Sequence, residues 1–258
     1  MKKILFLFLG ITLLSLSSCF KIDNWDAPDC TFHGTVYDEY TKEPILSSQD
    51  DWQFRIWERS WKGHEGGATT HQDLRIKQDG TYQNTKLFAG TYDMHPYNGP
   101  FWPMDTLRGV VLKGTTKMDF TVTPYLQILD FSYQIVEIRV PGAAPIPGLT
   151  FKCKVKAPIL EKDGVALPNL YEVKAFISRT QWCGEGSNSR ISEYDNDVRV
   201  RPNRPWVDNG NNSETTAEFT IGPIQVKKGY TYWVRMGAAV NDSYRKFNYS
   251  DIQRVVIP

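Results

Sequence analysis

Alternation of apolar and polar residues over positions 149–157 is the pattern that most constrains the fold of this chain. Five apolar residues alternate there with a threonine and three lysines: Leu149, Phe151, Cys153, Val155 and Ala157. Successive side chains of a β-strand point to opposite faces, so this period of two predicts a strand with one buried and one solvated face. The first half of the chain shows no convincing helical period, and we predict an all-β protein.

Strand and turn signals fill residues 31–124. Trp52, Phe54 and Ile56 alternate with polar or amphipathic neighbours, which predicts a half-buried strand with Trp52 in the core. The order of a G-x-V-x-D-x-x-T-x-x-P segment at 34–44, an Asp-Gly-Thr-Tyr turn at 79–82 and Phe-Ala-Gly-Thr-Tyr at 88–92 resembles transthyretin-like or carboxypeptidase-regulatory-like β-sandwiches. The resemblance implies a first β-sandwich domain over 31–124.

A second β-sandwich is predicted over 125–258, after a proline that a central strand would not accommodate. Further alternating runs lie at 171–177 and 217–221. The segment 228–238 resembles the sixth strand of a fibronectin type III or Ig-like domain. That resemblance makes Tyr232 the tyrosine-corner residue, whose hydroxyl returns to the backbone.

The N-terminus carries an export signal. Two lysines precede an apolar run over 4–16 that is too short to span a bilayer, and Leu-Ser-Ser-Cys follows at 16–19. This resembles a bacterial lipoprotein signal, with 1–18 removed and a lipid attached to Cys19. The alternative is an ordinary secretory signal that happens to contain a cysteine. Residues 19–30 are rich in aspartate and form a predicted acidic tether.

Charge and cysteines limit the function classes. The leader contains two lysines and no acid, so 28 basic and 29 acidic side chains remain, for a net charge of −1. This balance argues against a nucleic-acid partner. With Cys19 carrying lipid, three cysteines remain in a chain exported to a compartment where disulfides persist. We expect a Cys153–Cys183 disulfide, with Cys30 as a free or buried thiol; other pairings stay open.

Taken together, these segments resemble a domain-of-unknown-function lipoprotein family encoded beside Sus-like outer-membrane glycan transporters. The segments 98–101 and 122–125 are the most similar. The resemblance implies an outer-membrane, cell-surface location, a membrane anchor at Cys19, and a role beside Sus-like transporter proteins. It implies no catalytic residue.

Enzyme signatures are missing from the sequence. His64-Glu65 lacks the second histidine of a zincin, and the four histidines never fall at a helical i, i+4 spacing. No Walker loop or dinucleotide fingerprint occurs. We therefore predict no enzyme activity, no cofactor and no metal site. A metal site or a carboxylate pair assembled only by the fold stays an alternative.

Exposed aromatic residues are the strongest binding signal. Trp57 and Trp61 share the odd-numbered face of their predicted strand with Arg55 and Arg59. Indole rings offer flat surfaces for pyranose rings, and guanidinium groups donate hydrogen bonds to hydroxyls or carboxylates. We predict polysaccharide binding on this face. The alternative is that a loop or the second domain covers it.

A turn-rich loop over 97–103 adds Tyr97 and Trp102 as candidate ligand-binding residues, although its Phe101 could equally anchor the loop on the sandwich. The predicted function is a non-catalytic surface lipoprotein that binds polysaccharide and assists glycan uptake. The alternative is an interaction protein that docks onto a transporter or another protein without binding sugar.

Overall fold

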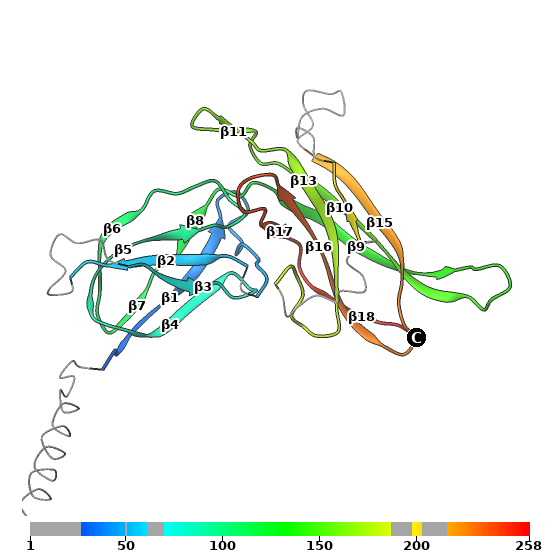
Figure 1. Cartoon of the computed structure of the whole chain (residues 1–258), viewed down its shortest axis with the longest axis horizontal. Helices are drawn as coiled ribbons and strands as arrows, with labels where there is room; N and C mark the ends of the chain where they lie inside the picture. The colour runs from blue at the N-terminus through cyan, green and yellow to red at the C-terminus, as the bar shows by residue number, and fades with distance from the viewer. Residues whose placement is uncertain (1–26, 50, 61–69, 187–197, 203–215) are drawn as a thin grey trace, which may run out of the picture.

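The chain folds into two β-sandwiches. The computed structural model describes residues 27–49, 51–60, 70–186, 198–202 and 216–258. Strands are the regular elements within these ranges, and the two sandwiches lie side by side (Figure 1). The predicted all-β class with two tandem sandwiches is confirmed. No helix among the described residues is long and apolar enough to cross a membrane.

The first sandwich consists of two four-stranded sheets. One has the order β4-β1-β7, with β8 also paired to β1, and the other has the order β3-β2-β5-β6. The strands are β1 (Cys30–Asp38), β2 (Gln53–Glu58), β3 (Gln72–Arg75), β4 (Thr81–Leu87), β5 (Gly90–Tyr97), β6 (Leu107–Leu112), β7 (Thr115–Lys117) and β8 (Phe120–Val122).

Aromatic side chains fill the space between these two sheets. Phe54 of β2 stacks on Tyr82 of β4, with ring centroids 4.8 Å apart, and Phe32 of β1 packs against both. Trp52 is 1% exposed, so its predicted place in the core is confirmed. Its ring meets Phe101 edge-on at 5.1 Å. Phe101 therefore anchors its loop on the sandwich, as the alternative interpretation of that loop held.

The second sandwich also has two sheets. One has the order β15-β10-β9, and the other has the order β14-β13-β16-β17, with β18 also paired to β16; β11 and β12 form a separate hairpin. The strands are β9 (Gln127–Ile138), β10 (Ile146–Lys156), β11 (Glu161–Lys162), β12 (Val165–Ala166), β13 (Leu170–Ser178), β14 (Arg199–Val200), β15 (Thr216–Gln225), β16 (Thr231–Val240), β17 (Phe247–Tyr249) and β18 (Gln253–Val256).

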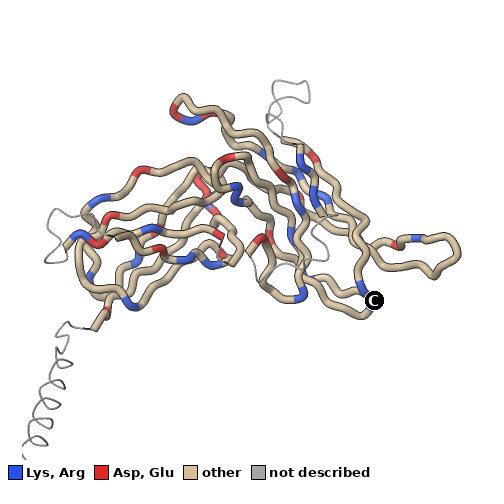
Figure 2. Tube along the Cα trace, viewed as in Figure 1, with Lys and Arg blue, Asp and Glu red and all other residues tan. Residues whose placement is uncertain are grey.

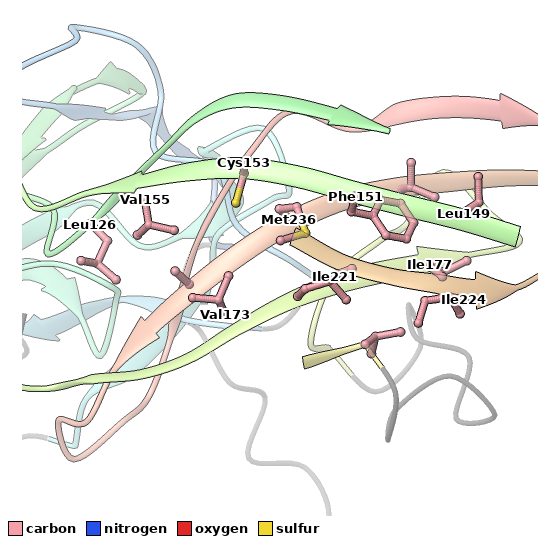
Figure 3. Close-up of a cluster of buried hydrophobic side chains, with 14 of the residues drawn as sticks. Leu126, Leu149, Phe151, Cys153, Val155, Val173, Ile177, Ile221, Ile224 and Met236 are labelled. Carbon is pink, nitrogen blue, oxygen red and sulfur yellow. The ribbon is translucent and has the colours of Figure 1, made fainter. Parts of the chain in front are cut away.

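The core of the second sandwich comes from the alternating residues. Phe151, Cys153 and Val155 of β10 point inward and pack with side chains of β13, β15 and β16 (Figure 3). Tyr232 at the start of β16 is buried, and its hydroxyl accepts a hydrogen bond from the backbone N–H of Lys227 at 3.1 Å. The predicted return of this hydroxyl to the backbone is confirmed.

The expected Cys153–Cys183 disulfide is wrong. All three described cysteines are free and buried. Cys153 lies in the core between the two sheets of the second sandwich, whereas Cys183 lies in a separate cluster with Phe176, Phe247 and Tyr249. Burial raises the pKa of both thiols to about 12. Sequence spacing could not reveal that the two cysteines belong to different apolar clusters.

This separate cluster covers the outer face of β13 and β16, where the first sandwich meets the second. Leu46 of the first sandwich packs there against residues of the second. Around it, Gln78 donates to the carbonyl of Gln181 and accepts from the N–H of Cys183, both at 3.0 Å. Both faces of β13 and of β16 are therefore buried along most of their length.

A charged group lies inside this contact. Arg235 of β16 is fully buried, with its guanidinium carbon 3.6 Å from the centroid of the Tyr249 ring. Its three side-chain nitrogens have no hydrogen-bond partner among the described residues. Tyr249 donates a hydrogen bond to Asp51 of the first sandwich at 3.0 Å, and Lys246 lies 3.2 Å from the same carboxylate. Burial raises the pKa of Asp51, and Lys246 opposes this shift.

The burial of the three free thiols predicts how slowly they react with a thiol reagent. A chain that starts at Phe20 keeps all three of these cysteines. Buried thiols of raised pKa react slowly with a disulfide reagent such as DTNB. We expect almost no reaction at pH 8 in the native state and three thiols after unfolding in guanidinium without reductant. Recovery of only one thiol per unfolded chain would indicate a disulfide instead.

The contacts of Asp51 at the interface between the two sandwiches predict how much its removal lowers the free energy of unfolding. Asp51→Ala leaves the buried Arg235 cation without its neighbouring carboxylate, and breaking such a set costs about 3 kcal/mol. Urea unfolding at pH 7 measures this loss. Asp105→Ala, at an exposed position, serves as the matched control and should change stability by less than about 0.5 kcal/mol. An equal response of the two variants would contradict the role assigned to Asp51.

Candidate functional site

The outer face of the β3-β2-β5-β6 sheet gathers aromatic and charged side chains. Phe54 and Ile56 of β2 point into the core, so Arg55 and Trp57 point away from it. The register places Arg55 opposite His95 of β5, and Trp57 opposite Asp93. Cross-strand neighbours on one face lie within side-chain contact. Residues separated by 36 or more positions in the sequence therefore share one surface.

Four rings form a row across this face. The centroid of Trp57 lies 5.4 Å from that of His95, His95 lies 5.7 Å from Tyr97, and Tyr97 lies 5.9 Å from Tyr244. Tyr244 belongs to the second sandwich, between β16 and β17, and is 45% exposed. The row therefore crosses from the first sandwich to the second. We call these four residues the aromatic row.

Arg55 is fixed beneath the row by two partners. Its Nε and one terminal nitrogen donate to the two oxygens of Asp73 at 2.7 and 2.8 Å, a bidentate arrangement. Its guanidinium carbon also lies 3.7 Å from the centroid of Tyr97. The hydrogen bonds from Arg55 hold the pKa of Asp73 below its usual value. Both side chains are therefore charged at neutral pH and rigidly placed.

His95 contributes the imidazole ring of the row, between Trp57 and Tyr97. Burial lowers its pKa, and the nearby Arg55 lowers it further. Its Nδ1 lies 2.8 Å from the hydroxyl of Thr106. At neutral pH the ring thus offers an uncharged aromatic surface between Trp57 and Tyr97.

Two arginines converge at the Trp57 end of the row. Arg59 donates from Nε to Asp93 Oδ2 at 2.9 Å, and Arg108 lies 3.5 Å from the same oxygen. The other oxygen of Asp93 accepts the backbone N–H of Gly109 at 3.0 Å. Along the described chain of the first sandwich, basic and acidic residues are interspersed rather than gathered in one region (Figure 2).

The structure brings four of the predicted residues together. Arg55, Trp57, Arg59 and Tyr97 lie on or beside this face, and Trp57 and Tyr97 are partly exposed. The prediction that Trp102 is an available ring is wrong. Trp102 is 3% exposed and packs against Tyr125 in the core of the second sandwich. The backbone N–H of Trp102 donates to the Thr123 carbonyl, which ties the loop to the chain that joins the two sandwiches.

Two further predicted positions, Cys19 and Trp61, lie outside the described residues. Other members of the face were not predicted: His95, Tyr244, Asp73, Asp93 and Arg108. The alternation of β5 could have indicated His95, because it shares odd parity with Tyr97. Nothing in the sequence could indicate Tyr244, which reaches the row only because the two sandwiches meet.

A hollow of about 300 Å³ between the sandwiches is a second candidate binding site. Its polar lining includes Asp38, Glu43 and Asp251, with apolar contributions from Ile45 and Ile128, and the described lining contains no lysine or arginine. Asp38 already accepts a hydrogen bond from Gln127 across the hollow at 2.7 Å. No group of three or more His, Cys, Asp or Glu side chains in the described ranges is arranged to hold a metal ion. The aromatic row is therefore the better-formed site.

Solved structures with this fold share nearly the whole chain. A candidate carbohydrate-binding protein from Bacteroides uniformis is 22% identical, with a TM-score of 0.65 over 89% of this chain and 100% of that chain. A DUF3823 family protein from the same species is 22% identical, with a TM-score of 0.64 over 90% and 100%. A DUF3823 family protein from Parabacteroides merdae is 18% identical, with a TM-score of 0.59 over 89% and 100%. At these identities the likeness concerns the fold.

Family models divide the chain in the same way. The model of the DUF3823 N-terminal domain, from proteins of unknown function, matches residues 30–123, and the DUF3823_C domain of unknown function matches residues 147–254. A search of curated proteins found no match. The resemblance noted from the sequence is confirmed at the level of the family: because the two models cover most of its length, the chain belongs to the DUF3823 family.

Proposed function

We propose that this protein is a non-catalytic polysaccharide-binding protein that assists glycan uptake. The observation that carries the proposal is the aromatic row on the outer face of the first sandwich. The electron-rich face of an aromatic ring attracts the polarised C–H groups of a pyranose ring. A row of rings along a sheet suits an extended chain of sugars better than a single small molecule, which would need a concave pocket.

Polar groups beside the rings would set the orientation of the sugar. Arg55 and Asp73 hold each other in a fixed geometry, so their remaining donor and acceptor sites are preorganised for hydroxyl groups. Arg55 also covers part of Tyr97, which leaves Trp57 as the main stacking surface. The B. uniformis structure described as a candidate carbohydrate-binding protein supports the proposal of polysaccharide binding by analogy of fold.

The proposed location is the outer membrane, at the cell surface, with a lipid anchor on Cys19. This part of the proposal rests on the basic N-terminus, the short apolar run and the Leu-Ser-Ser-Cys segment. Two or more acyl chains would give lasting attachment. The proposed partners are a polysaccharide and a Sus-like outer-membrane transporter, as the family resemblance implies.

A second candidate function is docking onto a transporter or another protein without sugar. It is favoured by the hairpin of β9 and β10, which extends beyond the rest of the second sandwich (Figure 1). Ile135 and Val140 of this hairpin are 44% and 46% exposed. A partner that packed against this projecting element would bury these apolar side chains. This function needs no free aromatic row.

Substitution of the row distinguishes the two functions. We expect Trp57→Ala, and separately Tyr97→Ala, to weaken binding to a polysaccharide recognised by the wild-type chain at least about tenfold, since each removes stacking surface. Affinity gel electrophoresis against a panel of soluble polysaccharides identifies that ligand and measures the loss. Thermal unfolding of each variant establishes that the fold persists.

Trp182→Ala is the matched control, because Trp182 is an exposed tryptophan (44%) of the second sandwich, outside the row. It should bind as the wild type does. Equal binding by all three folded variants would remove the row as the site. Absence of binding to every polysaccharide in the panel would favour the docking function.

A further inference from the structure

A turn of the second sandwich reaches one end of the aromatic row. Residues 241–246 connect β16 to β17, and Tyr244 in this turn lies against Tyr97 of the first sandwich, with their hydroxyl oxygens 3.3 Å apart. The Oδ1 atom of Asp242 accepts hydrogen bonds from the backbone N–H groups of Tyr244 and Arg245, at 3.1 and 2.6 Å. Such side-chain hydrogen bonds fix the backbone of a turn. Tyr244 and Arg245 are therefore presented in a defined position beside the row.

Arg245 is held on the surface of the second sandwich, directly after Tyr244. Its Nε donates to the side-chain oxygen of Asn241 at 3.0 Å, and its guanidinium carbon lies 4.4 Å from the centroid of the Tyr171 ring. Tyr171 belongs to β13, which pairs with β16, the strand that leads into the turn. Arg55 on the first sandwich is held in a similar way, by hydrogen bonds and by an aromatic ring. Each sandwich thus places one guanidinium group beside the row.

Arg245 keeps donors that its own contacts do not use. The residue is exposed, and its two terminal nitrogens have no hydrogen-bond partner in the described part of the chain. Its contacts with Asn241 and Tyr171 stay within the second sandwich, whereas the next residue, Lys246, forms the ion pair with Asp51 of the first sandwich at 3.2 Å. Docking of the two sandwiches therefore does not need the Arg245 guanidinium group, and its terminal donors are available to a ligand.

From this arrangement we infer that the bound sugar chain continues past Tyr244 onto the second sandwich, where Arg245 donates hydrogen bonds to its hydroxyl groups. The inference rests on the proposed function and extends its site across both sandwiches. The Cα atoms of Tyr244 and Arg245 are about 3.8 Å apart, so a chain that passes over Tyr244 comes within reach of the arginine. The rings of His95 and Tyr97 separate Trp57 from Tyr244. Only a chain of several sugar units can therefore contact both Trp57 and Arg245.

The length of the ligand tests the inference. A graded series of oligosaccharides is prepared from the polysaccharide that the wild-type chain binds, and calorimetry measures the affinity of the chain from Phe20 onward for each. A short oligosaccharide that occupies only Trp57 should bind equally to the wild type and to Arg245→Gln. The longest should bind Arg245→Gln at least about fivefold more weakly, because a hydrogen bond from a charged donor is lost. The melting temperature of this variant should match that of the wild type.

Arg254→Gln is the matched control, since Arg254 is an exposed arginine of the same sandwich. It stands opposite Trp233 near the start of β16, whereas the turn follows the end of that strand, and it should bind every oligosaccharide as the wild type does. Equal affinity of Arg245→Gln and the wild type for the longest oligosaccharides would overturn the inference and leave polysaccharide binding by the first sandwich intact. An equal loss at every length would also overturn it. Failure to bind any polysaccharide would overturn the proposed function together with this inference.

Discussion

Burial of Arg235 between the two sandwiches is the interaction on which the rest of the structure depends. A guanidinium group removed from water loses its hydration, and burial lowers its pKa. The Tyr249 ring and the Asp51 carboxylate offset part of that cost. Because Asp51 belongs to the first sandwich and Arg235 to the second, this compensation exists only when the two are docked. The contact between Tyr97 and Tyr244 follows from the same docking.

The candidate site is built on the solvent face of a sheet rather than in a cleft. Its residues are held by the register of β2, β3 and β5, and their backbone is fixed by the core on the other side. A surface held in this way can contact several units of an extended polymer at once. The irregular pairing of β5 with β6 places both Arg108 and Gly109 beside Asp93 on this face.

Trp57 and Trp102 illustrate where prediction from sequence succeeds and where it fails. Trp57 lies in a strand, and the parity of its neighbours fixes which way it points. Trp102 lies in a loop, where no periodicity exists, and its direction depends on what the loop meets. It meets the segment that connects the two sandwiches and is buried in the second core. The two cysteines differ in the same way. The alternation along β10 shows that Cys153 points inward, whereas no local pattern shows which residues Cys183 packs against.

The sequence by itself determined the all-β class, the two sandwiches, the core face of the main strands and the outward direction of Arg55 and Trp57. Each of these depends on the two-residue period of a strand, which is a local property. Only the tertiary structure decided that His95, Asp93 and Asp73 adjoin those residues, that Tyr244 completes the row, and that Arg108 turns outward. These depend on register, on a bulge and on the contact between sandwiches, in which residues far apart in the sequence meet through packing that no local pattern encodes.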